Sequence, residues 1–201
     1  MKKAIVLLAD GFEDVEAVTP LDYLRRAGIE VITAAIYVSC DSDKPLQTDL
    51  TVTSRWGRIK IIADTTITKI REQIINNKGQ IEWDAVILPG GIPGATNLAA
   101  SKEVSALITE MASAGKLICA ICASPAVVLA PLGLLAGRKF TCYPGQEEKT
   151  TEGEYTGTRV VVDGNLITSR SAGTAGEFAI AIIRNLLDEA TAQKIASAVL
   201  L

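Results

Sequence analysis

The stretch LICAICASPAVVLA, residues 117–130, joins a run of apolar residues to a segment that begins with small residues and a proline. The run KLICAI predicts a buried strand, and SPAVVLAPLG predicts a helix with Ser124 as its N-cap and Pro125 at its first position. A strand that runs straight into a helix places the residue at the junction on a tight turn above the sheet. Cys122 occupies this junction, which is the arrangement of a nucleophile elbow.

Strands alternate with helices along the rest of the chain. The run AIVLLA (4–9) is continuously apolar, as expected of a parallel strand that is covered on both faces. Further strands are predicted at 30–35 and in DAVILPGG, and helices in TTITKIREQIINN, KEVSALITEMASAG, GEFAIAIIRNLL and ATAQKIASAVL. LTVTS and RIKIIA indicate a hairpin or edge strands, and RVVVDGNLITS a hairpin turned at Asp163-Gly164. This order predicts an α/β sandwich with a mainly parallel sheet.

The helix that follows the first strand contains Pro20. Val15, Val18, Leu21 and Leu24 recur at near-helical spacing, and Gly28 stands where the helix should stop. Pro20 permits two interpretations, a short helix capped by Thr19 or a longer, kinked helix that starts near Glu13.

Composition limits the classes of function. The 201 residues fit one domain, 1–201, and the formal net charge of −3 argues against a nucleic-acid partner. No apolar run reaches the roughly 18 residues of a membrane helix, and the amino-terminal segment lacks a secretory pattern, so a cytoplasmic protein is expected. Because the chain contains no histidine, Ser-His-Asp and Cys-His triads and His-containing zinc sites are excluded. Acid–base chemistry is left to Glu, Asp, Cys, Tyr or Lys.

Three loops follow predicted strands, where α/β sheets place their ligands: DGFEDVE, LPGGIPGA and CASPA. At the third loop, Cys122 faces a helix amino terminus, which should lower its pKa and make it reactive; an inert, buried cysteine is an equally good interpretation. Gly90 and Gly91 could present backbone amides to an oxyanion, or they could form a plain glycine turn.

The remaining acids and thiols carry different expectations. Glu16 shares the inward stripe of its helix, where burial would raise its pKa and let it donate a hydrogen bond; Glu13 and Asp14 are expected on a solvated face. Cys119 is expected in the core, because residues three apart on a strand point to opposite faces. Cys40 is expected in an exposed loop without a role, and Cys142 could lie near the same pocket as Cys122.

Together these loops resemble the DJ-1/ThiJ/PfpI superfamily, in particular its small bacterial ThiJ-type branch. The resemblance is carried by LADGFEDVEAVTPLDYLRRAGIEV, DAVILPGGIPGATNL, AICASPAVVLAPLGLLAGRKFTCYPG and ITSRSAGTAGEFAIAII, in that order. It implies a flavodoxin-like three-layer sandwich and a homodimer. It also implies that Cys122 is a nucleophile and an oxidation-sensitive thiol, and that Glu16 is the protonated carboxyl that hydrogen-bonds it.

The resemblance extends to the surroundings of the thiol. It implies that the amides of Gly91 and Ala123 form an oxyanion site, and it makes Arg55 of TSRWG and Arg26 of LRRAG candidates for anion binding, with an arginine reaching the partner's site. Gly90 and Tyr143 join these as substrate-binding candidates. Tyr143 stands where better-known relatives have histidine, and a phenol can donate a hydrogen bond but is a poor base at neutral pH.

Two functions follow from the resemblance. The first is a cofactor-free and metal-free glyoxalase or deglycase, in which Cys122 and Glu16 convert methylglyoxal, or its protein adducts, to a hydroxyacid. The second is an oxidative-stress sensor or redox-regulated chaperone that uses oxidation of Cys122. Peptidase or amidase activity is disfavoured, because those members have histidine after the cysteine and this chain has Ala123.

Overall fold

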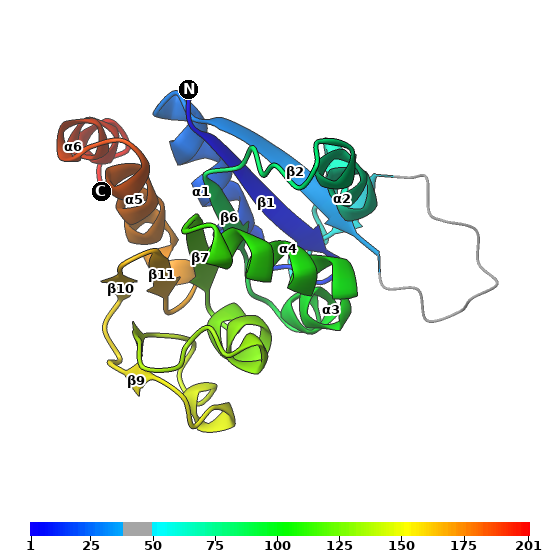
Figure 1. Ribbon diagram of the computed structural model, residues 1–201. Helices are drawn as coiled ribbons and strands as arrows, with labels where there is room; N and C mark the ends of the chain where they lie inside the picture. The colour runs from blue at the N-terminus through cyan, green and yellow to red at the C-terminus, as the bar shows by residue number, and fades with distance from the viewer. Residues whose placement is uncertain (38–49) are drawn as a thin grey trace.

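The computed structural model describes residues 1–37 and 50–201, and its centre is a seven-stranded sheet (Figure 1). The strand order is β10-β11-β7-β6-β1-β2-β5. All neighbours pair in parallel except β10 and β11, so the predicted mainly parallel sheet is confirmed. The strands are β1 (Lys3–Ala9), β2 (Glu30–Ile36), β5 (Thr65–Thr66), β6 (Ala85–Leu88), β7 (Leu117–Ile121), β10 (Val160–Asp163) and β11 (Leu166–Ser169).

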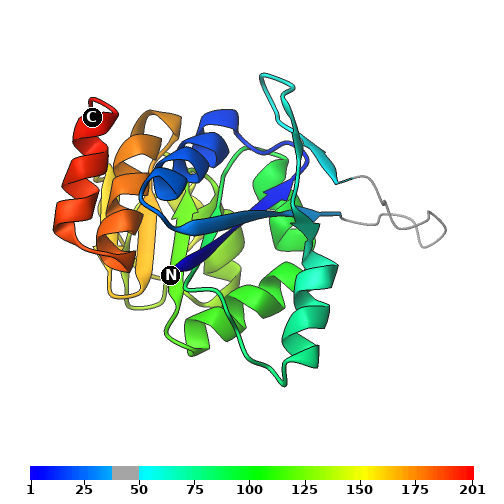
Figure 2. The ribbon, with the colours of Figure 1, turned by 90° about the horizontal axis from the view of Figure 1, so that it is seen from above.

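Helices cover both faces of this sheet (Figure 2). One face carries α1 (Asp14–Arg26), α5 (Ala175–Leu186) and α6 (Glu189–Ala198), and the other carries α2 (Ile67–Asn76), α3 (Gly94–Ala100) and α4 (Lys102–Ser113). The α/β three-layer sandwich predicted from the alternating pattern is therefore present.

The continuous apolar runs of the central strands are explained by this layering. In β1, Ala4, Val6 and Leu8 belong to the core under α1 and α5, whereas Ile5, Leu7 and Ala9 belong to the core on the opposite face. Successive side chains of a strand point to opposite faces, so a strand that is covered twice must be apolar at every position. These two cores hold the carboxyl ends of the strands in fixed relative positions.

Helix α1 follows the longer of the two interpretations that Pro20 allowed. It begins at Asp14, and the Glu13 carboxylate caps it by accepting a 2.8 Å hydrogen bond from the Glu16 amide. Pro20 lies inside the helix and is buried. The longer helix matters for function, because it places Glu16 in the first turn, directly at the carboxyl end of β1.

The segment after β7 is less regular than predicted. It forms a π-helical turn, Pro125–Leu129, and a 3₁₀ turn, Ala130–Leu132, instead of one α-helix. The predicted capping role of Ser124 is wrong, because its backbone already has helical dihedral angles and its hydroxyl donates a 2.6 Å hydrogen bond to the Pro89 carbonyl. Ser124 thus ties the loop after β6 to the loop after β7.

A hairpin of β3 (Thr51–Thr53) and β4 (Lys60–Ile62) confirms the hairpin interpretation of this region. It is fixed to the loop after β1, because the Gly11 amide donates to the Thr53 carbonyl at 2.8 Å and the Arg55 amide donates to the Phe12 carbonyl at 2.8 Å. Two short strands, β8 (Lys139–Phe140) and β9 (Glu154–Tyr155), pair outside the main sheet.

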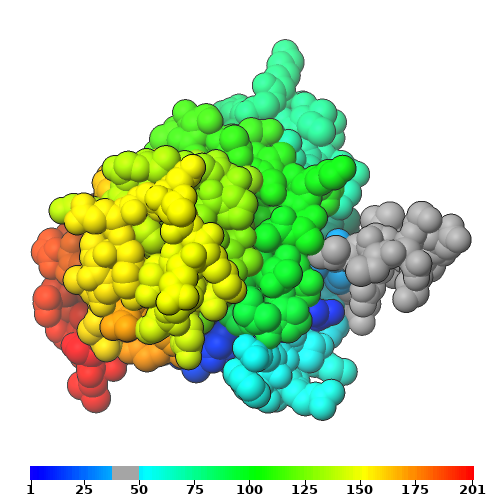
Figure 3. All heavy atoms as spheres, turned by 90° about the horizontal axis from the view of Figure 1, so that it is seen from below, coloured from blue at the N-terminus to red at the C-terminus, as the bar shows by residue number. Residues whose placement is uncertain are grey.

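The loops after β1, β6, β7 and β11 meet at one edge of the sheet. Figure 3 looks at this edge, where α1, the β3–β4 hairpin and the segment around 140–160 lie side by side on the surface. Within 1–37 and 50–201, every helix is too short or too polar to cross a membrane.

Candidate active site

Cys122 lies on the turn that its position between strand and helix predicts. Its φ of 64° is in the left-handed region, which side chains other than glycine rarely adopt and which costs about 1–3 kcal/mol. Two backbone hydrogen bonds hold the residue there: its amide donates to the Ser169 carbonyl at 2.9 Å, and its carbonyl accepts from the Tyr143 amide at 2.7 Å. Only 9% of Cys122 is exposed, so a reagent reaches the sulfur through a pocket.

The two glycines after β6 allow the chain to pass close to this turn. A Cβ on Gly90 would lie 2.6 Å from the Cys122 Cβ and 2.7 Å from Glu16 Oε2. Gly91 has a φ of +85°, and a Cβ there would lie 2.6 Å from the Gly11 carbonyl oxygen. Of the two residues, only Gly91 has a positive φ. Gly90 must be a glycine because a Cβ at this position would collide with Cys122 and Glu16.

Glu16 is fully buried beside the thiol. Its Oε2 accepts a 2.9 Å hydrogen bond from the Gly90 amide, whereas its buried Oε1 has no hydrogen-bond partner within the described residues. Burial, together with the negative charge of Glu13, raises the pKa of the Glu16 carboxyl to about 7. Glu16 therefore exchanges its proton near neutral pH.

Glu13 departs from the solvated position expected of it. It caps α1 and lines the pocket, and its charge is the second cause of the raised Glu16 pKa. The half-buried Asp14 accepts a hydrogen bond from the Gly57 amide at 3.3 Å, which joins α1 to the β3–β4 hairpin.

The expected lowering of the Cys122 pKa by the helix amino terminus is wrong. Burial raises the pKa of the thiol well above its usual range, and the carboxylate of Glu16 raises it further. Hydrogen bonds from the Gly91 and Ala123 amides act in the opposite direction and are outweighed. The thiol and the carboxyl are thus coupled, and above pH 7 the pair shares one proton.

A pocket of about 390 Å³ opens onto Cys122. Tyr143 is 47% exposed and forms part of its wall, and the Arg55 guanidinium lies 4.3 Å over the ring of Trp56 at the same pocket. The pocket is lined by Glu13, Glu16, Arg55, Trp56, Gly91, Ile92, Cys122, Ala123, Tyr143, Gln146, Ser171 and Ala172.

The structure does not bring Arg26 to this pocket. Arg26 lies at the far end of α1, ten residues and about 15 Å along the helix axis from Glu16. Its Nε pairs with Asp22 at 2.9 Å, and the side chain is half exposed. Its proposed role as an anion site is therefore wrong for the pocket of its own chain.

Neither Cys119 nor Cys142 lines the pocket with Cys122. Cys119 packs in the same core as Cys122, so the expectation that the two side chains point to opposite faces is wrong; Cys122 lies beyond the end of the strand. Cys119 is fully buried in β7, as expected of a core residue. Cys142 is also buried, and it packs in the core on the opposite face of the sheet from that of Cys122. Burial and the charge of Glu147 raise the pKa of Cys142 to about 12. Cys40 lies outside the described residues.

Several pocket residues escaped the sequence analysis. Ser171 and Ala172 directly follow β11, so the rule that ligands bind at strand ends would have found them. Gln146, whose buried Oε1 has no partner in the described part of the chain, and Trp56 come from irregular segments that carry no such signal.

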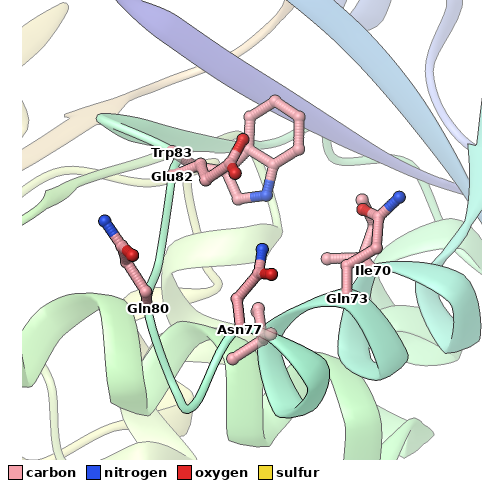
Figure 4. A pocket seen from close by; sticks show the side chains of 7 residues that line it. Ile70, Gln73, Asn77, Gln80, Glu82 and Trp83 are labelled. Carbon is pink, nitrogen blue, oxygen red and sulfur yellow. The ribbon is translucent and has the colours of Figure 1, made fainter.

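A second hollow, of about 190 Å³, lies at the opposite edge of the sheet. Figure 4 shows the indole nitrogen of Trp83 and the amide of Asn77 turned toward it, between α2 and the segment that leads into β6. Gln73, Gln80 and Glu82 complete its polar lining. Nowhere in 1–37 or 50–201 do three or more Cys, Asp or Glu side chains gather in a way that could hold a metal ion.

Comparisons with known proteins agree with this geometry. The chain is 38% identical over 179 residues to Protein DJ-1 homolog B of Arabidopsis thaliana, which covers 89% of the chain but only 36% of that protein. It is 32% identical to the glutathione-independent glyoxalase DJR-1.2 of Caenorhabditis elegans, covering 92% of the chain and 89% of that protein. A solved DJ-1 superfamily protein from Salmonella typhimurium superposes with a TM-score of 0.86 and 38% identity, covering 99% of this chain and 98% of the other.

The model of the DJ-1/PfpI family matches residues 2–185, which include the thiol, the buried carboxyl and both glycine positions described above. This chain therefore belongs to the DJ-1/PfpI family.

Proposed function

We propose that this protein is a cofactor-independent enzyme that converts small reactive carbonyls, such as methylglyoxal or its adducts on proteins, to hydroxyacids. The observation that carries the proposal is the convergence of Cys122, the fully buried Glu16 and the Gly91 and Ala123 amides on one pocket. A relative named as a glutathione-independent glyoxalase supports the same class of reaction.

The first step is addition of the Cys122 sulfur to the aldehyde carbon. Because its pKa is raised, the Cys122 thiol is still protonated when the aldehyde binds. The Glu16 carboxylate therefore accepts the thiol proton as the C–S bond forms. The carbonyl oxygen becomes an oxyanion, which the Gly91 and Ala123 amides stabilise by hydrogen bonds.

Glu16 first returns the thiol proton to the oxyanion, which gives a neutral hemithioacetal and regenerates the carboxylate. The carboxylate then moves a proton between the two carbon atoms of the oxoaldehyde. Transfer from the former aldehyde carbon to the neighbouring ketone carbon oxidises the first and reduces the second, leaving a thioester of the 2-hydroxyacid. Water cleaves the thioester, releases the hydroxyacid and returns the Cys122 thiol. The sum is one oxoaldehyde plus one water, with no external oxidant or reductant.

The test is lactate formation from methylglyoxal by the wild type and by the Cys122→Ala and Glu16→Gln variants. Removal of the nucleophile should abolish turnover, and removal of the proton acceptor should reduce kcat by about 10²–10⁴-fold. Cys119→Ala, at a buried thiol that does not line the pocket, is the matched control and should retain turnover. Unchanged lactate formation by both site variants would exclude this mechanism.

A redox sensor or redox-regulated chaperone is the second candidate. The unpartnered Oε1 of Glu16 favours it, because a protonated Glu16 has a hydrogen bond to donate to an oxidised Cys122. Mass spectrometry after graded peroxide should then find Cys122 oxidised before Cys142 and Cys119; the reverse order would contradict the sensor.

We propose further that the protein acts as a homodimer in the cytoplasm. Val15 and Val18 on α1 and Trp56, Ile59 and Ile62 on the β3–β4 hairpin are between 44% and 76% exposed, and Trp56 also lines the pocket. A second copy that covered these side chains would enclose the pocket mouth. Sedimentation of a monomer at micromolar concentration would contradict this. The free thiols of Cys119, Cys122 and Cys142 fit a reducing compartment.

A further inference from the structure

A further hollow, which we call the Arg170 hollow, adjoins the Cys122 pocket and has a volume of about 300 Å³. Its lining residues are Tyr143, Pro144, Arg159, Arg170, Ser171, Gly173 and Thr174. Tyr143 and Ser171 line both the Cys122 pocket and the Arg170 hollow, so a ligand bound at Cys122 can extend past these two residues into the Arg170 hollow.

The two arginines of this hollow differ in how many of their N–H groups are hydrogen-bonded and in whether they form an ion pair. Arg159 is engaged, because its Nε donates to both carboxylate oxygens of Glu177 at 2.9 and 2.7 Å and its Nη2 donates to the Gly173 carbonyl at 2.7 Å. Arg170 is half-buried, and its Nη1 donates a 3.2 Å bond to the Gly157 carbonyl. Among the residues that the structure describes, no carboxylate forms an ion pair with Arg170. A guanidinium has five N–H donors, so most of the hydrogen-bonding capacity of Arg170 is unused.

Arg170 is held close to the nucleophile by the sheet. It follows Ser169, whose carbonyl accepts the Cys122 amide hydrogen bond at 2.9 Å, so the backbones of β7 and β11 run about 5 Å apart at this point. Because Arg170 lines a hollow that shares Tyr143 and Ser171 with the Cys122 pocket, a ligand whose reacting carbonyl lies at Cys122 can extend toward the guanidinium.

The Cys122 pocket and the Arg170 hollow also differ in the charge of their lining residues. The Cys122 pocket contains the acids Glu13 and Glu16, and its one arginine, Arg55, lies over the Trp56 ring. In the Arg170 hollow the Glu177 carboxylate offsets Arg159, whereas Arg170 forms no ion pair with any described carboxylate. The charges of Arg170 and Glu147 act in opposite directions on the pKa of Cys142, but Glu147 does not line the hollow. An anionic group is favoured beside Arg170 and disfavoured beside the two acids.

We infer that Arg170 forms an anion-binding subsite that selects α-oxoaldehydes with a negatively charged group a few carbons from the reacting carbonyl. The inference rests on the proposed function and specifies its substrate class. The anionic group takes no part in the reaction: the aldehyde carbon is oxidised, the ketone carbon is reduced, one water is consumed, and the anion stays bound to the guanidinium throughout.

Two substrates that differ only in this group provide the test. 4,5-Dioxopentanoate carries a carboxylate where 2-oxopentanal carries a methyl group, and both have five carbons. We expect the wild type to have a kcat/KM at least about tenfold higher for the anionic substrate, the effect of one charge-assisted hydrogen bond. Arg170→Gln should reduce this ratio by about the same factor, and Arg170→Lys should restore part of it.

Arg184→Gln is the matched control, since Arg184 pairs with Glu189 and does not line either hollow. It should leave the ratio of the two kcat/KM values unchanged. Equal kcat/KM values for the two substrates, or a ratio that does not respond to Arg170→Gln, would overturn the subsite while leaving the proposed function intact.

If neither substrate is turned over, the proposed function itself is contradicted. A binding measurement then tests the Arg170 subsite by itself. The corresponding products, 2-hydroxypentanedioate and 2-hydroxypentanoate, are tested for protection of Cys122 from iodoacetamide. Stronger protection by the dianion, lost in Arg170→Gln, would support the subsite independently of catalysis. Equal protection by the two acids would overturn it.

Discussion

The hollow at Cys122 and the hollow at Trp83 lie at opposite ends of the strands of the sheet. They differ in how much backbone strain and how many unpaired buried polar groups they contain. At the Cys122 pocket, a non-glycine residue has positive φ, a fully buried carboxyl has an unpartnered oxygen, and two glycines admit close backbone contacts. At the Trp83 hollow, the polar groups are the exposed side chains of Gln73, Asn77, Gln80 and Glu82 together with the indole nitrogen of Trp83.

This contrast distinguishes the Cys122 pocket, whose features suit a chemical reaction, from the Trp83 hollow, which side-chain packing alone explains. Strained backbone and unpaired buried polar groups destabilise a fold, so they persist where the surrounding structure enforces them. Burial at the first pocket couples a thiol to a carboxyl that titrates near neutral pH. Lys78, between Asn77 and Gln80 of the Trp83 hollow, also has a positive φ of 56°, but none of the residues that line this hollow has an unpaired buried polar atom. The Trp83 hollow therefore supplies matched reference positions for testing the Cys122 pocket.

The largest expected difference concerns how two carboxyls, the buried Glu16 and the exposed Glu82, affect the free energy of unfolding. Because its pKa is raised in the folded state, Glu16 makes the protein lose stability as the pH rises from about 4.5, its ordinary value, to about 7. Glu16→Gln does not titrate, so it should gain about 3 kcal/mol in free energy of unfolding relative to the wild type above pH 7, and almost nothing near pH 4.

Urea unfolding at pH 4, 6 and 8 measures this difference. Glu82→Gln, at the exposed carboxylate of the second hollow, is the control and should change stability by at most about 0.5 kcal/mol at each pH. A pH-independent difference between Glu16→Gln and the wild type would mean that Glu16 is not the titrating group.

Alkylation by iodoacetamide should distinguish the coupled thiol from an ordinary one. Below pH 7 the Cys122–Glu16 pair holds both protons, so the rate at Cys122 should rise about tenfold per pH unit up to about pH 7 and then flatten. A thiol introduced by Asn77→Cys in a Cys122→Ala background should follow the ordinary thiol pKa of about 8.5.

Site-resolved mass spectrometry from pH 5 to 9 would record both profiles. Glu16→Gln should lose the inflection near pH 7. If wild-type Cys122 instead rose in a single step with the same midpoint as the introduced thiol, the two residues would titrate independently.

The smallest effect is expected at two glycines. Gly90→Ala places a Cβ against Cys122 and Glu16 and should cost about 1–3 kcal/mol while strongly slowing Cys122 alkylation. Gly79→Ala, beside the second hollow, meets no atom within 4 Å; its φ of +83° should cost about 1–2 kcal/mol and leave alkylation unchanged. Thermal unfolding and the alkylation rate measure the two effects separately, and normal alkylation of Gly90→Ala would mean that the loop has room to move.

Much of the architecture was predictable because it depends on local pattern. Continuously apolar strands such as AIVLLA require cover on both faces, and the junction of KLICAI with SPAVVLA fixed Cys122 on its turn. The position of Glu16 was predictable only in part. Val15 and Val18, which the helical spacing grouped with Leu21 and Leu24, are exposed, and the buried side of α1 consists of Glu16, Ala17, Pro20, Leu21 and Leu24.

The sequence by itself determined the layering, the mainly parallel pairing of the strands and the turn at Cys122, because periodicity and turn chemistry act over a few residues. Tertiary structure alone decided the direction of the Cys122 pKa shift, the separation of Arg26 from the pocket and the position of the Arg170 hollow next to the Cys122 pocket. Desolvation and charge coupling depend on which distant segments meet at Cys122. Local sequence does not encode those distances.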